Sequence, residues 1–273
     1  MSRLGSAIRV VFSYAAKTLA GCLMIAASPA ASQGMMGNVD LDAPDFVEAE
    51  LTRDAIVKLI GARPAAPVDL TGKRLNGLDL SGLDLSKAVL RSARLNKTNL
   101  EGSTLTGAIL DQAWMIAADL SAANLSGASL FQTQLGSAIL DGADLSGARV
   151  AADLTRASLK GAVLTGADLS ADMRNQSMGL MRGVLRSANL DGADLTGANL
   201  ARVSLEFASL RGAILARADV SGAELGGADL TGADISGANF DDADLDSARL
   251  IALKGEEENS FKRARNYGAA IRR

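Results

Sequence analysis

The chain contains no histidine and a single cysteine, Cys22. The lack of imidazole excludes serine–histidine triads, histidine general bases and histidine metal sites. One cysteine can form neither an internal disulfide nor a cysteine-rich zinc site. Aromatic residues make up only 3% of the sequence, and a net charge of −3 gives no electrostatic drive for bulk binding to nucleic acid. We therefore expect no enzyme, no cofactor, no metal site and no direct contact with nucleic acid.

Residues 1–30 have the order of a bacterial secretory signal. Their charged residues are all basic, the stretch 18–27 is apolar, and small residues precede a cleavage point after Ala30. The apolar stretch is too short to remain in a bilayer as a spanning helix. These features predict an exported, periplasmic protein that has lost residues 1–30.

A lipoprotein is the second interpretation of this segment. Residues 19–22 resemble a lipobox in which Cys22 would carry the lipid, although Lys17 interrupts the apolar run that a lipobox requires. A retained anchor, or no export at all, is the third alternative. Contact with a membrane is expected only through a lipid on Cys22 or through the basic C-terminal tail.

From residue 68 onward the sequence repeats every five residues. Leucine or a close substitute recurs from Leu70 to Val150, alanine usually stands two residues earlier, and Ser/Thr-Gly often follows. The register shifts by one residue at Leu154, breaks over 171–179 and then resumes up to Leu250. A period of five fits neither a helix nor a flat strand, and a fixed period over this length is typical of a solenoid. We expect coils with four five-residue sides, with Leu and Ala pointing inward and Gly near the corners.

The repeat resembles the pentapeptide-repeat family, whose consensus is A(D/N)LXX, over about residues 68–252. Clear instances are Ala193-Asp194-Leu195-Thr196-Gly197, Ala198-Asn199-Leu200 and Ala228-Asp229-Leu230-Thr231-Gly232. The resemblance implies an all-β fold, a right-handed quadrilateral β-helix. At twenty residues per coil this gives about nine coils and a rod of roughly 43 Å. The best-known biochemistry of the family is topoisomerase inhibition by fluoroquinolone-resistance proteins that resemble DNA in shape and charge.

Both flanks are expected to cap the ends of the rod with short helices. Within the N-terminal segment 31–67, Pro44 begins a helix that apolar residues at four-residue spacing continue to residue 60. The C-terminal segment 253–273 is charged and carries a rough apolar stripe, which predicts a helical cap or a tail. The alternatives for it are a basic surface for a membrane or an acidic partner, or a dimerisation helix. The sequence leaves the oligomeric state open.

An acidic stretch near the end of the repeats suggests a mimic of DNA. Residues 219–246 contain eight acidic and no basic side chains, among them Asp229, Asp234 and Asp244. Residues 68–253 as a whole hold 22 acidic and 16 basic side chains, a net of −6, whereas B-DNA of that length carries roughly 25 negative charges. Alternating Asp and Asn at twenty-residue spacing would relieve repulsion between stacked coils. This pattern favours a role in solubility and coil packing.

Two features break the repeat and are candidate partner surfaces. The first is a set of apolar side chains at outward positions, Ile109, Trp114 and Phe131, of which Ile109 and Trp114 should lie on adjoining sides of one coil. Single apolar residues are also common on protein surfaces. The second is the loop 171–179 with Met173 and Arg174, which is either a recognition loop or a tolerated insertion.

The sequence therefore predicts a non-enzymatic, exported protein that acts as a rigid scaffold or protein-interaction surface for a protein partner of unknown identity. The alternative is a DNA-mimic inhibitor or protector of a type II topoisomerase, gyrase. Export separates the two functions, because gyrase is cytoplasmic.

Overall fold

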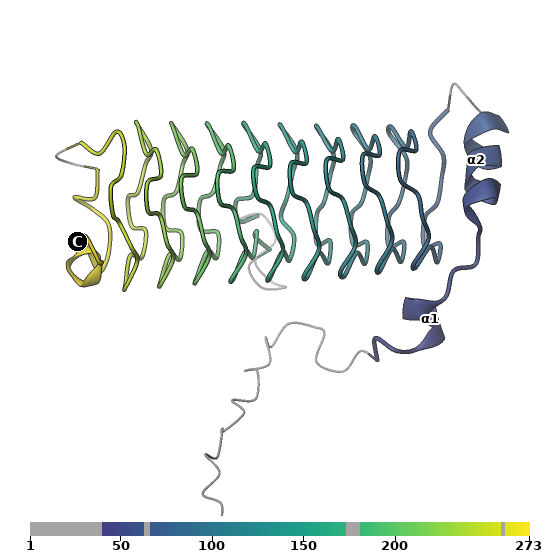
Figure 1. Ribbon diagram of the computed structural model, residues 1–273, viewed down its shortest axis with the longest axis horizontal. Helices are drawn as coiled ribbons and strands as arrows, with labels where there is room; N and C mark the ends of the chain where they lie inside the picture. The colour runs from purple at the N-terminus through teal and green to yellow at the C-terminus, as the bar shows by residue number, and fades with distance from the viewer. Residues whose placement is uncertain (1–39, 63–65, 173–180, 258–259) are drawn as a thin grey trace, which may run out of the picture. The chain divides into compact units, whose positions relative to one another are not determined.

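A stack of short coils makes up most of the protein (Figure 1). The computed structural model describes residues 40–62, 66–172, 181–257 and 260–273, so the predicted signal segment 1–30 with Cys22 lies outside the described residues. Leu41–Arg273 form one compact unit. Its helices are α1 (Pro44–Val47), α2 (Arg53–Ala62) and the 3-10 helix η2 (Tyr267–Ala269). In the four described ranges, none of the helices has the length and apolar character needed to cross a membrane.

Neighbouring coils are joined by single parallel β-bridges between residues twenty apart, such as Asp79 with Asn99. Four such bridges follow one another in each regular coil, which gives it four sides. At the Asp79–Asn99 bridge, the Asn99 amide donates to Leu78 O at 2.9 Å and the Leu80 amide donates to Asn99 O at 2.7 Å. The backbone polar groups are thus satisfied between coils. The predicted repeat β-helix is confirmed. Each side of a coil is only five residues long and ends in a turn, so neighbouring coils are joined by single β-bridges and not by longer strands.

The corners are β-turns whose third residue has a positive φ. In one of them the Ala128 amide donates to Leu125 O at 3.0 Å, and Gly127 has φ +63°. A turn of this kind requires the left-handed region at its third position, where glycine suffers no steric cost. Many other corners place a residue with a side chain there, such as Ala122 with φ +53°. The Ser/Thr-Gly part of the repeat is therefore a turn signal.

The core is formed by the inward leucine and alanine of each side, as the sequence predicts. Leu125 is fully buried and Ala128 is 1% exposed, and the same positions from Leu70 to Leu250 form one continuous cluster. Full burial of one leucine contributes about 1.5–3 kcal/mol. The rod therefore needs no disulfide or metal to hold its coils together.

The one-residue shift in the repeat falls at a single corner. Gln134 pairs with Asp153, one residue short of the usual twenty. The shortened corner carries Ala151 and Ala152, which are only 4% and 2% exposed, whereas a regular corner residue such as Ser137 is exposed. A corner with one residue fewer lies closer to the axis of the coil, which favours small side chains there.

The insertion occurs at the same corner of the next coil. Asp153 pairs with Val184 beyond it, so the stack of coils continues across the insertion. At its base Asp172 forms an antiparallel bridge with Met181, whose sulfur accepts a hydrogen bond from Gln132 Nε2 at 3.1 Å. Residues 173–180, most of the predicted loop 171–179, lie outside the described residues.

The expected single helix over 44–60 is instead two helices, α1 and α2. Between them Ala49 forms an antiparallel bridge with Leu75, and the Glu50 amide donates to Arg74 O at 2.9 Å. This segment satisfies the open edge of the first coil, which a continuous helix could not do. Helix α2 then starts after Thr52, whose Oγ1 accepts a hydrogen bond from the Ala55 amide at 3.2 Å, and it buries Ile56 in the core.

The coil continues past the expected end at residue 252. Arg265 pairs with Asp244 and Ile271 pairs with Arg249, so most of the C-terminal segment belongs to the last coil. Its only helical part among the described residues is the single 3-10 turn η2. Phe261 is 5% exposed and closes the core at this end.

Candidate interaction surfaces

The polar residues of the repeat bind one another within the turns. The carboxylate of Asp153 accepts hydrogen bonds from the Thr155 amide at 2.9 Å and from the Thr155 hydroxyl at 2.6 Å. Such bonds favour the charged carboxylate, and those from the Ser86 hydroxyl and amide hold the pKa of Asp84 below its ordinary value. The preference for Asp or Asn before Leu, and for Ser or Thr after it, is therefore a property of the turn.

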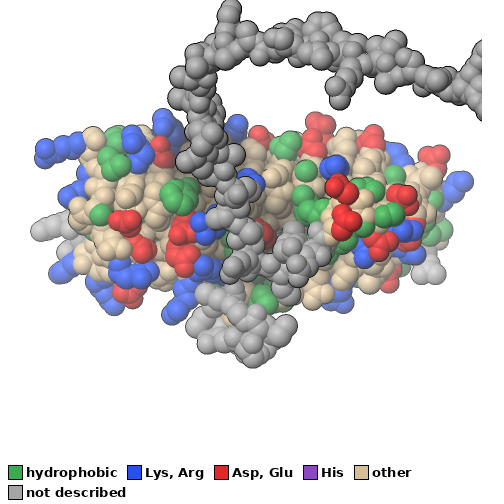
Figure 2. Space-filling view, turned by 90° about the horizontal axis from the view of Figure 1, so that it is seen from below, with side chains coloured by type: hydrophobic (Ala, Val, Ile, Leu, Met, Phe, Trp, Pro, Cys, Tyr) green, Lys and Arg blue, Asp and Glu red, His purple; other side chains and the backbone are tan. Residues whose placement is uncertain are grey.

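The three acidic residues predicted as a surface, Asp229, Asp234 and Asp244, lie on three different sides of the coils. Asp229 lies 3.1 Å from Arg211 Nη1 and 3.6 Å from Arg249 Nε, so arginines of the neighbouring coils neutralise it. Figure 2 shows basic and acidic side chains interspersed along the visible face of the rod. The acidic residues of the last coils therefore do not form one continuous stripe on that face.

Asp234 and Asp244 are held by hydrogen bonds. The Ser236 hydroxyl and amide, in that order, lower the pKa of Asp234, against a small opposing effect of burial. Asn266 Nδ2 donates to Asp244 Oδ1 at 2.8 Å and is the largest cause that lowers the pKa of Asp244. Burial alone would raise the pKa of Asp229. The hydrogen bonds from Thr231 and the charge of Arg211 outweigh this effect, so the pKa lies below its ordinary value.

The basic residues of the first coils pair with the N-terminal segment. Lys73 Nζ lies 3.2 Å from Glu50 Oε1, Arg74 Nη1 lies 3.1 Å from Asp45 Oδ1, and Arg94 Nη2 lies 3.4 Å from Asp45 Oδ2. The hydrogen bond from Lys73 is the largest of the causes that hold the pKa of Glu50 below its ordinary value. The positive charge of the first coils is thus partly neutralised by the chain itself.

Two buried asparagines fix this segment against the coils. Asn76 Nδ2 donates to Asp45 O at 3.1 Å and to Glu48 O at 2.9 Å, while its Oδ1 accepts from the Asn96 amide at 3.0 Å. Asn96 Nδ2 donates to Phe46 O at 3.3 Å. Sequence reasoning missed this clamp, although two asparagines twenty residues apart, where serine or threonine is usual, were a usable signal.

The clamp brings Phe46 onto Trp114. Their ring centroids are 4.8 Å apart in an edge-on arrangement, and the Arg94 guanidinium lies 5.2 Å from the centroid of Phe46. Trp114, predicted as part of a partner surface, is therefore half-buried by the chain's own segment. Ile109 lies on the adjoining side of the coil between Val89 and Ser129 and is also half-buried.

Phe131 lies at the corner that carries the insertion. The Arg149 guanidinium is 4.7 Å from its ring centroid, and Arg149 Nη2 also lies 3.2 Å from Asp172 Oδ2 at the base of the insertion. Phe131 thus borders the base of the insertion, a proximity that the sequence did not predict. Met173 and Arg174 lie outside the described residues.

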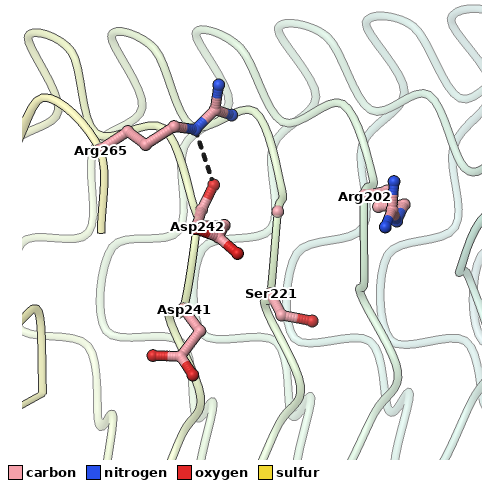
Figure 3. A pocket seen from close by; sticks show the side chains of 6 residues that line it. Arg202, Ser221, Asp241, Asp242 and Arg265 are labelled. Carbon is pink, nitrogen blue, oxygen red and sulfur yellow. Dashed lines mark hydrogen bonds between the residues drawn. The ribbon is translucent and has the colours of Figure 1, made fainter. Parts of the chain in front are cut away.

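A hollow of about 420 Å³ lies near the C-terminal end, lined by Arg202, Ser221, Gly222, Asp241, Asp242 and Arg265. Figure 3 shows Arg265 and Arg202 at opposite ends of it, with Asp242 and Asp241 below Arg265 and Ser221 between the aspartates and Arg202. Arg265 Nε donates to Asp242 O at 2.9 Å. The mixture of charges on an open surface gives no preference for an anion or a cation.

The described residues contain no cluster of three or more His, Cys, Asp or Glu side chains that could hold a metal ion. Stacked coils with five-residue sides, a leucine–alanine core and aspartate-capped corners define a parallel β-helix of the repeat type. The family model for pentapeptide repeats matches in eight copies, over residues 74–112, 84–121, 115–150, 150–171, 184–215 and 213–250. The chain belongs to the pentapeptide repeat family.

Solved structures of other pentapeptide repeat proteins are similar. HetL, a pentapeptide repeat protein involved in heterocyst differentiation regulation from the cyanobacterium Nostoc sp. strain PCC 7120, is 33% identical over 81% of this chain and 94% of its own, with a TM-score of 0.44. QnrB1, a plasmid-mediated fluoroquinolone resistance protein, is 20% identical over 76% of this chain and 86% of its own, with a TM-score of 0.40. No curated protein matches the sequence significantly.

Proposed function

We propose that the protein is a non-enzymatic rod, of about nine right-handed coils at twenty residues each, that acts as a rigid scaffold or protein-interaction surface. The observation that carries the proposal is that the repeat's carboxylates and hydroxyls are engaged in turns, as Asp153 is with Thr155. Side chains held in this way stiffen the coil and are not free for chemistry. The side chains that vary from coil to coil at outward positions then distinguish one part of the surface from another.

We further propose that the protein is exported and works in the periplasm, on the strength of the signal-like order of residues 1–30. Fractionation of the native host, followed by mass spectrometry of the N-terminal peptide, tests this. A mature chain that begins after Ala30 supports the proposal, and a lipidated N-terminal Cys22 supports the lipoprotein alternative. An intact Met1 in the cytoplasmic fraction would contradict both.

The interaction role is tested by photo-crosslinking in the native host. A benzophenone amino acid is placed in turn at four outward positions on different sides and corners of two coils, Phe131 and Ile139 in one and Phe207 and Ile214 in the other. We expect a discrete adduct with one protein from at least one position, and none from the same strains without irradiation. A uniform lack of adducts, with each variant folded by circular dichroism, would count against an interaction surface on these coils.

A DNA-mimic inhibitor or protector of gyrase is the second candidate, favoured by the eight acidic residues in 219–246. Against it stand the pairing of Asp229 with arginines and that of Glu224 with Arg182, at 2.7 Å. We expect the purified protein to leave gyrase supercoiling unchanged. Inhibition at stoichiometric protein, abolished by joint replacement of Asp229, Asp234 and Asp244 with asparagine, would reverse the ranking.

A further inference from the structure

Phe207 is an exposed aromatic side chain in a strained backbone position. Its exposed fraction is 63%, the highest among the exposed large hydrophobic residues of the described ranges. It occupies the third position of a corner turn with φ +58°, a region that is unusual for a bulky residue. Other corners hold smaller or polar side chains at a similar φ, so what distinguishes Phe207 is the size and the exposure of its ring.

The ring of Phe207 packs against a glycine of the next coil. A Cβ on Gly227, the residue twenty positions on, would lie only 2.7 Å from Phe207 Cδ1, so a residue other than glycine would displace the ring. The preceding residue, Gly226, also lacks a side chain. Phe207 therefore lies across a bare corner with much of its ring open to solvent.

Three other rings of the described chain are covered by arginine. A guanidinium lies 5.2 Å from the centroid of Phe46, 4.7 Å from that of Phe131 and 4.6 Å from that of Tyr267. Among the described residues, no guanidinium and no second ring stacks on Phe207. Arg186, at the same corner of the preceding coil, is instead paired with Glu206, Nη1 to Oε2, at 2.9 Å.

We propose that Phe207 is the docking point for an arginine-bearing segment of a partner protein, an inference that rests on the proposed role as an interaction surface. A guanidinium stacked on the ring gains a cation–π interaction, as the chain's own arginines do on Phe46 and Phe131. Glu206 beside the ring is already paired with Arg186, whereas the exposed Asp246, which precedes the corner residue two coils on, offers a carboxylate as acceptor for its N–H groups. An exposed acidic neighbour of this kind favours a basic peptide over an anionic lipid surface.

The probe is a synthetic peptide with three arginines, and the control peptide carries citrulline at the same positions. Citrulline keeps the shape and the planar group of arginine but removes its charge. The full mature protein, labelled with ¹³C in its phenylalanine rings, is titrated with each peptide. We expect the arginine peptide alone to shift the ring signals of Phe207, which are assigned by their loss in Phe207→Leu.

Two variants test whether the ring of Phe207 itself binds the arginine peptide. Phe207→Leu should weaken binding of the arginine peptide about two- to fivefold, as expected for an exposed cation–π contact. Phe131→Leu should leave the affinity unchanged, because Arg149 already covers that ring. Equal affinity for wild type and Phe207→Leu, or for the arginine and citrulline peptides, would overturn the inference.

A stability measurement excludes a purely structural role for the ring. Phe207→Gly relieves the positive φ, so its melting temperature should equal or exceed that of the wild type. A lower melting temperature together with unchanged peptide affinity would make Phe207 a packing residue. If a crosslink in the native host forms only from Phe131, Ile139 or Ile214 and the arginine peptide does not bind at Phe207, this inference is refuted. The proposed role as an interaction surface would still stand.

Discussion

Polar residues at the inward alanine position differ in whether they find a hydrogen-bond partner. Thr98 Oγ1 donates to Leu75 O at 2.8 Å, and Thr133 Oγ1 donates to Leu110 O at 2.8 Å. Ser103 is 1% exposed, and its Oγ has no hydrogen-bond partner among the described residues. A buried hydroxyl without a partner costs about 1–3 kcal/mol in lost hydration. A hydroxyl at this position therefore stabilises the stacked coils where it finds a carbonyl acceptor and destabilises them where it does not.

We expect Ser103→Ala to raise the free energy of unfolding by about 1 kcal/mol, because it removes the unbonded hydroxyl and restores the consensus residue. Thr98→Val, which keeps the shape but removes the bond to Leu75 O, should lower it by about 1 kcal/mol. Urea unfolding followed by circular dichroism measures both. A loss of stability in Ser103→Ala would mean that its hydroxyl has a partner after all.

At the scale of one side of a coil, the turn-capping carboxylates link stability to pH. The Ser81, Ser86 and Thr196 hydroxyls are the largest causes that lower the pKa values of Asp79, Asp84 and Asp194. A carboxyl whose pKa is lower in the folded than in the unfolded chain binds fewer protons when folded, so stability rises with pH. Their contribution is complete above the ordinary value of 3.8 and is lost as the pH falls through the folded values.

We expect the joint replacement of Asp79, Asp84 and Asp194 by asparagine to reduce the pH dependence of folding. Asparagine accepts the same turn hydrogen bonds, as Asn124 Oδ1 does from the Ser126 amide at 2.9 Å, but does not titrate. The free energy of unfolding should therefore fall less between about pH 6 and pH 3 than in the wild type. Denaturant titrations across this range measure the slope, and identical slopes would show that these groups are not linked to folding.

The fluorescence of Trp114 reports whether the N-terminal segment is docked on the coils. Trp114 is the only tryptophan, and Phe46 covers it at 4.8 Å. We expect Phe46→Ala to shift the tryptophan emission to longer wavelength, because water then reaches the indole, while the β-helix stays folded. Asn76→Ala should cause a similar shift by releasing the Asp45 and Glu48 carbonyls.

Phe131→Ala is the matched control for this experiment, since it removes a phenyl ring from a different corner and should leave the emission unchanged. Unchanged emission in Phe46→Ala would contradict the docking of this segment on the coils.

For the whole molecule, the ends are the weak points, because an open β-helix exposes both its core and unpaired backbone groups. Helix α2 covers the first coil with Ile56, which is fully buried. At the other end Phe261 lies between two rings, 5.0 Å from Phe240 and 5.1 Å from Tyr267. The rod is thus closed by aliphatic packing at one end and by aromatic packing at the other.

We expect Phe261→Ala to destabilise the protein by about 3 kcal/mol and to promote self-association through the opened end. Thermal unfolding and light scattering coupled to size exclusion measure the two effects. Tyr267→Phe keeps the ring stack and serves as the control. A variant that loses stability but stays in the wild-type oligomeric state would show that the cap does not control association.

The sequence by itself determined the coil. The five-residue period predicts the inward leucines, the buried alanines and the corners, because each side repeats the same short-range turn and its contacts twenty residues away. It does not predict that Asp153 and Thr155 are hydrogen-bond partners, although both residue types appear in the consensus.

Only the tertiary structure decided how the non-repeating parts meet the rod. The expected helix over 44–60 is divided because its middle pairs with the edge of the first coil, and Trp114 is covered because the Asn76 and Asn96 amides hold Phe46 above it. It also showed that, within the described ranges, no arginine stacks on Phe207 as Arg94 does on Phe46. These contacts join residues that share no period, so they depend on the three-dimensional position of each side chain and leave no regular pattern in the sequence.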